Sequence, residues 1–352
     1  MRIALVSTPF AAVPPRGYGG TELVVAQLER GLAAAGHQVT LFATGDSGGA
    51  DVRWVYERPV WPIDARAELV HCRAAAHAIA RGRFDVVHAH APQLLRWERL
   101  LGAPLVHTLH HARDERLLTL YRDHPGVRYV AISRRQAQLV PELSCSVIHH
   151  GLDPGSFPAG AGEGGFALFL GRLSHSKGLD LAVRAAAEAG LELVVAGAVH
   201  GEPDDPPTWR EQVAEMLSRP GVRAVGPVAG RVKRELLGGA RALLMPIRWE
   251  EPFGLVMIEA MLSGTPVVAT RRGAAPEVVE DGSTGFLVEG EDELGPALRR
   301  TAAIDRAACR RRARERFGAA RMVDDHLRLY RAVAAARALA AAGAPAAAEE
   351  GG

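Results

Sequence analysis

The chain has 352 residues, of which 48% are hydrophobic and 23% charged, and its net charge is +2. The length suits about two domains, and the composition excludes a disordered, collagen-like or disulfide-rich chain. The balanced charge gives no sign of a nucleic-acid partner.

The cysteines favour a reducing compartment, because Cys72, Cys145 and Cys309 are far apart and odd in number. The first apolar run is too short for a signal peptide, and no run of about 18 apolar residues predicts a membrane span. We therefore expect a cytoplasmic protein.

In the first half, short apolar runs alternate with helical patterns, which is typical of a parallel α/β sheet. A helix is expected from Thr21, a favoured N-cap residue, to about Gly36. Strands are expected at 3–7, 39–43, 85–88, 104–108, 129–133 and 147–149.

Residues 151–165 hold six glycines and two prolines, which indicates a linker, and the α/β pattern then restarts. Strands are expected at 166–170, 191–196, 242–246 and 266–269, with helices from about 177 and at 254–263. We predict domains at 1–153 and 154–318, a helix at 319–342 that packs back toward the first domain, and a disordered Ala-rich tail at 343–352.

Nine arginines lie between Arg299 and Arg321, in expected helices that begin near residue 293. A solvated helical face is the simpler interpretation. The alternative is peripheral contact with anionic lipid headgroups, which polybasic helices can provide.

Parallel sheets bind ligands beyond the carboxyl ends of their strands, so the residues that follow each strand are the candidates. The first strand is followed by a loop that ends in Gly19-Gly20 before a helix. Such glycines let an anion approach free N–H groups at the helix N-terminus, although a flexible, well-capped loop is the simpler interpretation. The dinucleotide-binding fingerprint is absent, because its last glycine is missing.

Two further strands end in histidines, at His88 and His90 and at His107, His110 and His111. Imidazole is a common zinc ligand, but no H-E-x-x-H or paired cysteine spacing supports a metal site, and we predict none. His88 and His107 fit a core position, whereas His110 is the better candidate for contact with a polar substrate.

The segment from Gly171 to Gly178 follows a strand and precedes a helix. Its two cations, Arg172 and Lys177, suit a diphosphate, since arginine offers a planar fork and lysine a point charge. The alternative of ordinary surface charge is weakened because Lys177 and Lys233 are the only lysines in the chain.

The segment 245–269 is the strongest signal. A strand leads to an acidic loop and then to an apolar helix, whose first turn offers the amides of Gly254 and Leu255. Glu259 falls among apolar residues, where a carboxylate needs partners such as sugar hydroxyls; the alternative is a salt bridge on a helix surface.

Glu251 and Glu259 stand as E-x7-E within E-P-F-G-L-V-x-I-E-A-M, and Arg172 and Lys177 stand within G-R-L-x3-K-G. Together these motifs resemble the retaining nucleotide-sugar glycosyltransferases of the GT-B fold, family four. The resemblance covers nearly the whole chain and implies an α/β protein with two Rossmann-like domains that face each other across a cleft.

The resemblance also implies roles for residues. Arg172 and Lys177 would hold the donor diphosphate, with the amides of Gly19, Gly20, Gly254 and Leu255 around its oxygens. Glu251 would bind hydroxyls of the transferred sugar, Glu259 those of the ribose, and His110 the sugar near the reacting carbon. The donor would be a UDP- or GDP-sugar, and no cofactor or metal would be required.

The chain departs from the family pattern at His149-His150, at Ala274 and in the histidine-rich stretch after His110. These departures concern the donor and the acceptor rather than the reaction class. An acceptor (a saccharide, a lipid-linked group or a small metabolite) would lie near Arg16, Tyr18, His90 and the segment 91–99, which includes Trp97.

Two alternatives stay open. A GT-B phosphorylase or sugar-phosphate synthase would need further cations, for which Arg16 and Arg113 are available. A non-catalytic nucleotide-sugar-binding protein would retain the fold but have lost Arg172, Lys177 or Glu251, and all three are present. A Rossmann dehydrogenase is disfavoured by the missing fingerprint.

Overall fold

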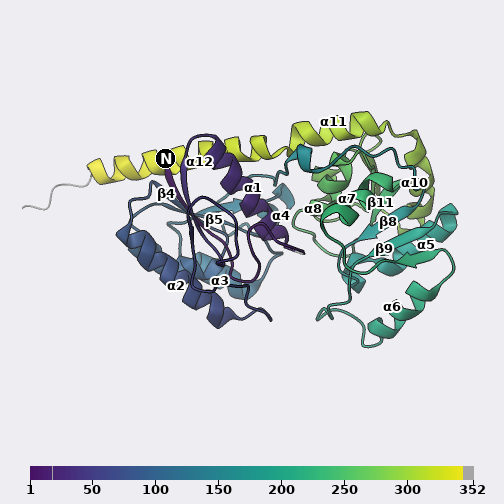
Figure 1. The fold of residues 1–352 in the computed structure, drawn as a ribbon, viewed down its shortest axis with the longest axis horizontal. Coiled ribbons are helices and arrows are strands. Elements are labelled where there is room, and N and C mark those ends of the chain that lie inside the picture. Colours follow the sequence, from purple (N-terminus) through teal and green to yellow (C-terminus); the bar gives the residue numbers. More distant parts are fainter. Residues whose placement is uncertain (18, 344–352) are drawn as a thin grey trace, which may run out of the picture.

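The computed structural model describes residues 1–17 and 19–343, which form two lobes joined by a linker and by the C-terminal helix (Figure 1). Each lobe contains one sheet, and all strand pairs of both sheets are parallel. The predicted fold class of two parallel α/β domains is confirmed. Residues 344–352, which make up most of the predicted tail, and Tyr18 lie outside the described residues.

The first sheet has the strand order β3-β2-β1-β4-β5-β6-β7. Its strands are β1 (Arg2–Val6), β2 (Gln38–Phe42), β3 (Val52–Arg53), β4 (Val86–Ala89), β5 (Leu105–Thr108), β6 (Arg128–Ala131) and β7 (Cys145–Val147). The helices of this domain are α1 (Gly20–Ala34), α2 (Ala65–Arg81), α3 (Glu115–Arg122) and α4 (Arg134–Leu139), with a 3-10 segment at Pro92–Leu100.

The second sheet has the strand order β10-β9-β8-β11-β12-β13. Its strands are β8 (Ala167–Leu170), β9 (Leu193–Ala196), β10 (Val222–Ala224), β11 (Ala242–Met245), β12 (Val267–Thr270) and β13 (Gly285–Val288). The helices that follow the linker are α5 (Leu179–Ala189), α6 (Trp209–Ser218), α7 (Gly230–Gly239), α8 (Leu255–Leu262), α9 (Ala275–Val278), α10 (Leu294–Arg300), α11 (Arg306–Phe317) and α12 (Ala319–Gly343), with short 3-10 turns at Pro154–Ser156, His175–Lys177, Glu291–Glu293 and Thr301–Ala303.

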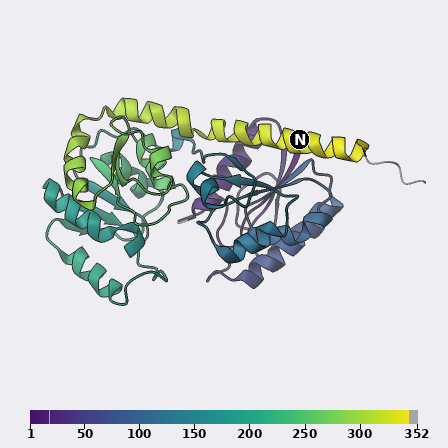
Figure 2. The same ribbon diagram turned by 180° about the vertical axis from the view of Figure 1, so that it is seen from behind.

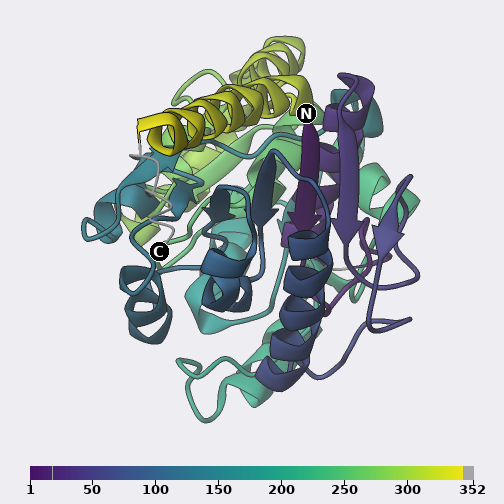
Figure 3. The same cartoon turned by 90° about the vertical axis from the view of Figure 1, so that its left-hand side faces the viewer.

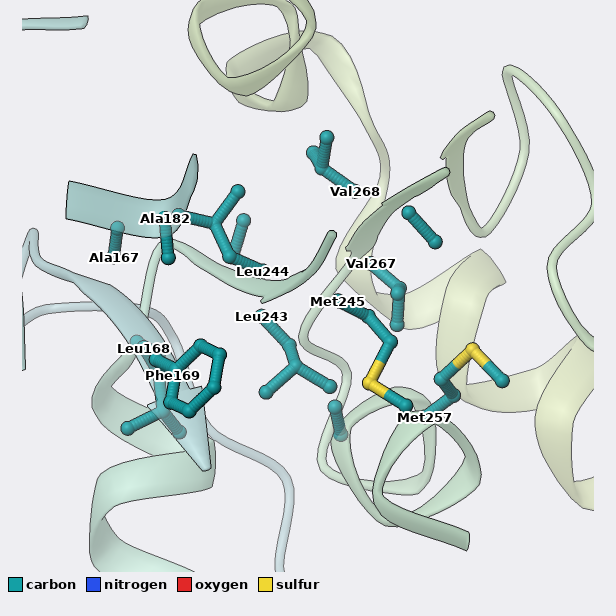
Figure 4. Packing of buried hydrophobic residues seen from close by; sticks show 14 of the residues in the cluster. Ala167, Leu168, Phe169, Ala182, Leu243, Leu244, Met245, Met257, Val267 and Val268 are labelled. Carbon is teal, nitrogen blue, oxygen red and sulfur yellow. The ribbon is translucent and has the colours of Figure 1, made fainter. Parts of the chain in front are cut away.

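The central strands form as expected because they are apolar on both faces and helices cover both faces. In the second domain, β8, β11, β12 and helix α8 pack into one buried cluster, in which Met257 of α8 lies beside Met245 of β11 (Figure 4). In the first domain, α2 packs on one face of the sheet, whereas α1 packs on the other (Figure 3).

Helix α12 leaves the second domain and packs on the first, as Figures 1 and 2 show. Its side chains Met322, Val323, Leu327 and Tyr330 are buried with strands β1 and β2 and helix α1. A Cβ atom added at Gly31 of α1 would lie 2.3 Å from Val323, so the close contact between these helices requires glycine. Two chain crossings, the linker and the α11–α12 junction, therefore connect the domains.

The glycine-rich linker is packed rather than loose. Leu152 is fully buried and forms a bridge with Gly318, at the second crossing. A Cβ atom at Gly160 would lie 2.1 Å from the carbonyl oxygen of Gly238, so these glycines allow two backbone segments to touch. Glycine is needed here so that two backbone segments can pack closely, and not to make the linker flexible.

Two predicted helix starts were wrong by one or two residues. Helix α1 begins at Gly20 with Gly19 as N-cap, so Thr21 already lies inside the helix. The predicted helix from residue 177 begins at Leu179, because Lys177 ends a 3-10 turn and Gly178 adopts φ 74°.

The arginines between 299 and 321 are not only a solvated face. Arg306, Arg310, Arg316 and Arg321 are half-buried and donate hydrogen bonds to backbone carbonyls, among them those of Gly160, Phe157, Glu277 and His150. These four side chains hold the linker and the α9 region against α11 and α12, so they are not free to bind lipid headgroups. Within the described residues, no helix combines the length and apolar character that a membrane crossing requires.

Candidate active site between the domains

The loop that carries Arg172 and Lys177 is fixed to the loop after β11. Arg248 donates two hydrogen bonds of 2.7 Å to the carboxylate of Asp180, and its amide donates to the carbonyl of Ser176 at 2.8 Å. Gly178 is required here, since a Cβ atom would lie 2.0 Å from the carbonyl oxygen of Pro246. The two predicted phosphate-binding segments are therefore adjacent at the carboxyl ends of β8 and β11.

Each predicted cation of this loop is paired with a carboxylate. Lys177 forms an ion pair with Glu251, and both side chains are at most 14% exposed. Arg172 forms an ion pair with Glu202, a residue that the sequence did not single out. The Lys177 ammonium also lies 4.9 Å from the centre of the Trp249 ring, so cation and ring interact.

Two N–H groups in these two loops have no partner. The Nε–H of Arg172 and the Nε1–H of Trp249 are buried, and neither makes a hydrogen bond within the part of the chain that the structure describes. Buried donors are almost always paired, so the two orphaned donors, of which that of Trp249 lies beside Lys177, indicate a place for an acceptor such as an anion.

Helix α8 directs its N-terminus to the same place. Gly254, its N-cap, adopts φ 81°, and a Cβ atom there would lie 2.5 Å from the Cε of Met257. The first amides of a helix have no partner within the helix, so those of Leu255 and the next residue are available to a ligand.

The Gly19-Gly20 loop of the first domain faces this helix. A Cβ atom at Gly20 would lie 3.1 Å from the Cδ1 of Leu255, so the N-termini of α1 and α8 approach each other across the two domains. Glu22, in the first turn of α1, is buried and accepts a hydrogen bond of 2.6 Å from Thr8. Burial raises the pKa of the Glu22 carboxyl, and the Thr8 hydrogen bond opposes this shift.

Glu259 lies one turn further along α8 and is buried, as its apolar neighbours predicted. Its partner is Lys233 of α7, whose ammonium lies 2.6 Å from the carboxylate. Both lysines of the chain are therefore paired with the two glutamates of E-x7-E. The rarity of lysine was the one signal that could have identified Lys233.

Six histidines form a cluster against the first domain, which we call the histidine cluster: His88, His90, His107, His110, His150 and His326. Five of them are buried, and His110 is partly exposed. Tyr330 of α12 and Thr108 hydrogen-bond the two ring nitrogens of His88, at 2.6 and 2.7 Å. His90 and His110 hydrogen-bond each other at 2.8 Å, and His150 stacks on His110. His88 and His107 are core residues, as predicted.

Every member of the histidine cluster has a lowered pKa, because burial disfavours the imidazolium ion and the neighbouring histidines repel a second charge. Burial, His111 and His326 lower the pKa of His110 to about 3, and burial and Arg321 lower that of His326 to about 4. The cluster is therefore neutral at pH 7. No group of three or more metal-ligating side chains in the described residues is arranged to hold a metal ion.

The residues that depart from the family pattern have contacts of their own. His149 lies 3.0 Å from Glu277, whose carboxylate also accepts hydrogen bonds of 2.7 Å from the amides of Arg134 and Arg135. Glu277 thus connects the second domain to the start of α4 in the first. The sequence did not identify this interdomain contact. Ala274 is buried, and its amide donates to the carbonyl of Glu251 at 2.9 Å.

Several candidates for the acceptor side and for extra cations are engaged elsewhere. Arg113 pairs with Glu115 and Glu142 on the surface, whereas Arg16 is 80% exposed and lies 3.4 Å from Asp46. Trp97 packs against the core of the first domain. His90 is only 3% exposed, so it lies behind His110 rather than on an open surface. A groove of about 1110 Å³ beside the two chain crossings includes none of the predicted site residues.

These features define a class. The chain has two parallel-sheet domains, which is the GT-B architecture of glycosyltransferases. Charged residues lie at the carboxyl ends of the second sheet, and the N-terminus of α1 lies opposite them. Residues 18–155 match the family described as Glycosyltransferase Family 4, and residues 165–303 match Glycosyl transferases group 1.

Individual proteins agree with these matches. The phosphatidyl-myo-inositol mannosyltransferase of Mycolicibacterium smegmatis is 30% identical, over 84% of this chain and 83% of its own. A glycosyltransferase involved in avilamycin A biosynthesis is 28% identical and superposes with a TM-score of 0.72 over 95% of this chain and 98% of its own. Anabaena Alr3699/HepE, crystallised with UDP-glucose, is 19% identical, with a TM-score of 0.73 over 94% of this chain and all of its own. The chain belongs to the family four (group 1) glycosyltransferases.

Proposed function

We propose that this glycosyltransferase moves a sugar from a nucleoside-diphosphate sugar to an acceptor hydroxyl, with retention of the anomeric configuration and without a metal ion. The observation that carries the proposal is the set of N–H donors in the loops that follow β8 and β11: the unpaired Nε–H of Arg172, the unpaired Nε1–H of Trp249 beside Lys177, and the first amides of α8. A diphosphate supplies the acceptors that these donors lack.

The diphosphate lies between Arg172, Lys177 and the N-terminus of α8, with Gly20 of the opposite domain close enough for its amide to contribute. When the donor binds, its phosphate oxygens compete with Glu202 and Glu251 for the two cations. Glu251 is then free to accept hydrogen bonds from the sugar hydroxyls. Glu259, held by Lys233, binds the ribose.

The reaction breaks the bond between the anomeric carbon and the phosphate oxygen and forms a bond from the acceptor oxygen to the same face of that carbon. The acceptor proton passes to a phosphate oxygen of the donor, so no enzyme nucleophile is needed. Negative charge develops on the leaving diphosphate, where Arg172, Lys177 and the α8 amides stabilise it through preorganised hydrogen bonds. Closure of the two domains excludes water that would hydrolyse the donor.

The donor is a UDP- or GDP-sugar. A UDP-glucose complex of the structurally similar Anabaena protein supports a nucleotide sugar, and the mycobacterial relative is, by its name, a phosphatidyl-myo-inositol mannosyltransferase. The acceptor of this chain is a saccharide, a lipid-linked group or a small metabolite, bound against the first domain. The three cysteines are free, which agrees with a cytoplasmic enzyme.

A sugar-phosphate synthase is the second candidate, since Arg16 is exposed near the acceptor side. Arg113 does not favour it, because its guanidinium is engaged by Glu115 and Glu142. The two candidate functions can be separated by an assay of purified protein in EDTA. It would combine UDP- and GDP-sugars with saccharide, inositol, lipid and sugar-phosphate acceptors. An NMR spectrum of the product reports the anomeric configuration. Inversion, or turnover that requires added metal, contradicts the proposal.

A further inference from the structure

His110 is held from behind by a second histidine. Strands β4 and β5 are neighbours in register, with Ala89 opposite His107, so the residues that follow them, His90 and His110, lie side by side. The Nδ1 of His90 is 2.8 Å from the Nε2 of His110. The other ring nitrogen of His90, Nε2, is buried and has no partner among the described residues.

This asymmetry assigns the shared proton. If His110 donated from Nε2, neutral His90 would carry its own proton on Nε2, where it would be a buried N–H without an acceptor. If His90 donates from Nδ1, its Nε2 is a bare lone pair. Orphaned buried N–H groups are rarer than under-satisfied acceptors, so the second arrangement is favoured. Neutral His110 then carries its own proton on Nδ1.

We propose that His90 is a positioning residue: it fixes the proton of His110 on Nδ1, so that His110 offers the donor sugar an N–H group and cannot act as a base through Nε2. The tautomer follows from the geometry alone, whereas the contact with the sugar rests on the function proposed above. Nδ1 of His110 is available for this contact, because it makes no hydrogen bond with any of the described residues.

The surroundings restrict His110 further. His150 stacks on its ring with centroids 5.4 Å apart and planes inclined by 19°, and His150 in turn packs edge-on against Phe253 of the second domain. Burial lowers the pKa of both His90 and His110, so each ring carries a single proton at pH 7. A neutral donor suits a reaction in which the leaving phosphate, and not the enzyme, takes the acceptor proton.

The direct test is a ¹⁵N NMR spectrum of histidine-labelled protein at pH 7, with the His110 signals identified by their loss in His110→Gln. We expect a pyrrole-type shift for Nδ1 of His110 and a pyridine-type shift for Nε2. In His90→Leu the pattern should change toward protonation on Nε2. His90→Asn should restore it, because the asparagine amide lies where Nδ1 was and also donates. Protonation of His110 on Nε2 in the wild type, or an unchanged pattern in His90→Leu, overturns the proposal.

Kinetics supply the second readout. His90→Leu should lower kcat by about 10- to 100-fold with little change in KM, the usual size of the effect when a residue that orients a functional histidine is lost. His90→Asn should recover most of the loss. His107→Asn is the control, since His107 is equally buried but donates to the Ala89 carbonyl and makes no hydrogen bond with His110. A wild-type kcat in His90→Leu overturns the positioning role.

If no nucleotide sugar is turned over, the proposed function fails and the spectra still decide the tautomer. If His90→Leu does not fold, the proposal is tested by the other two results: protonation of His110 on Nδ1 in the wild-type spectrum, and a kcat of His90→Asn close to that of the wild type. The opposite of either result overturns it.

Discussion

The two domains bring opposite kinds of polar side chain to the interface between them. The second domain contributes ion pairs, Lys177 with Glu251 and Lys233 with Glu259, whereas the first contributes the neutral histidine cluster. None of the histidines in the second sheet domain is buried within the described residues. An anionic diphosphate needs fixed cations, whereas sugar hydroxyls can donate to a carboxylate and accept from a neutral N–H group. On the proposed function, the second domain would therefore hold the diphosphate, and the sugar would lie between Glu251 of the second domain and His110 of the first.

The largest effect is expected when Lys177, the lysine of the proposed diphosphate site, is removed. Lys177→Ala should lower kcat/KM by about 10³-fold or more, because the leaving diphosphate loses a preorganised cation. The variant should still melt cooperatively. Arg223→Ala is the matched control, since Arg223 is a half-exposed partner of Glu192 in the same domain. Near wild-type turnover of Lys177→Ala would show that the diphosphate lies elsewhere.

Glu251→Ala should also abolish measurable transfer, since the sugar loses a carboxylate that binds its hydroxyls. Binding of the free nucleoside diphosphate should persist or become tighter, because Lys177 no longer has an internal partner. Calorimetric titration of UDP or GDP together with the transfer assay separates these effects. Equal loss of nucleotide binding and transfer would contradict the assigned role of Glu251.

The histidine cluster predicts that acid destabilises the first domain. Its histidines have a lower pKa in the native state than the ordinary 6.5 of the unfolded chain, with values of about 3 for His107 and about 4 for His326. As the pH falls below 6.5, the unfolded state binds protons that the native state does not. Each such group therefore removes about 1.4 kcal/mol of unfolding free energy per pH unit, down to its native pKa.

Hydrogen exchange at pH 7.5 and 5.5 measures the loss of stability in acid separately for each domain. The amides of β1, β4 and β5 should lose more protection at pH 5.5 than those of β8, β11 and β12. A variant with His107→Asn should show a shallower dependence on pH, because asparagine does not titrate. Equal loss of protection in the two domains would remove the distinction between them.

The smallest predicted effect concerns the contact that joins the domains. Glu277→Gln weakens the interactions with the Arg134 and Arg135 amides and with His149. We expect a loss of about 1 kcal/mol of unfolding free energy, similar to removal of a helix cap, and a modest rise in KM for the donor. Small-angle scattering should report a more open average arrangement. An unchanged KM and radius of gyration would mean that Glu277 does not hold the domains together.

The sequence predicted the elements that have strong local signals. Central apolar strands such as β1, β4, β8 and β12 were found, because burial on both faces makes them continuous apolar runs. Strands β3, β10 and β13 were missed, since two to four residues at a sheet edge show little periodicity. The start of α5 was misplaced because only the left-handed conformation of Gly178 separates it from the turn of Lys177.

The predicted site residues come from both domains, but their partners could not be predicted. Lys233 and Glu202 reach the site from elements far along the chain, and no local pattern links them to Glu259 or Arg172. The contact of His90 with His110 had a usable signal, since both residues follow strands that end in histidine. The order of β4 and β5 in the sheet, which the sequence did not specify, was needed to bring them together.

The most direct test of the central claim is a thermal-shift panel of UDP-, GDP- and ADP-sugars in EDTA, with NAD and inorganic phosphate alongside. A ligand that binds only the native state raises the melting temperature by mass action. We expect one nucleotide sugar to raise it clearly, and the shift to be lost in Lys177→Ala but retained in Arg223→Ala. A shift with NAD or phosphate alone, or a nucleotide-sugar shift that survives in both Lys177→Ala and Arg172→Ala, would contradict a donor diphosphate at this site.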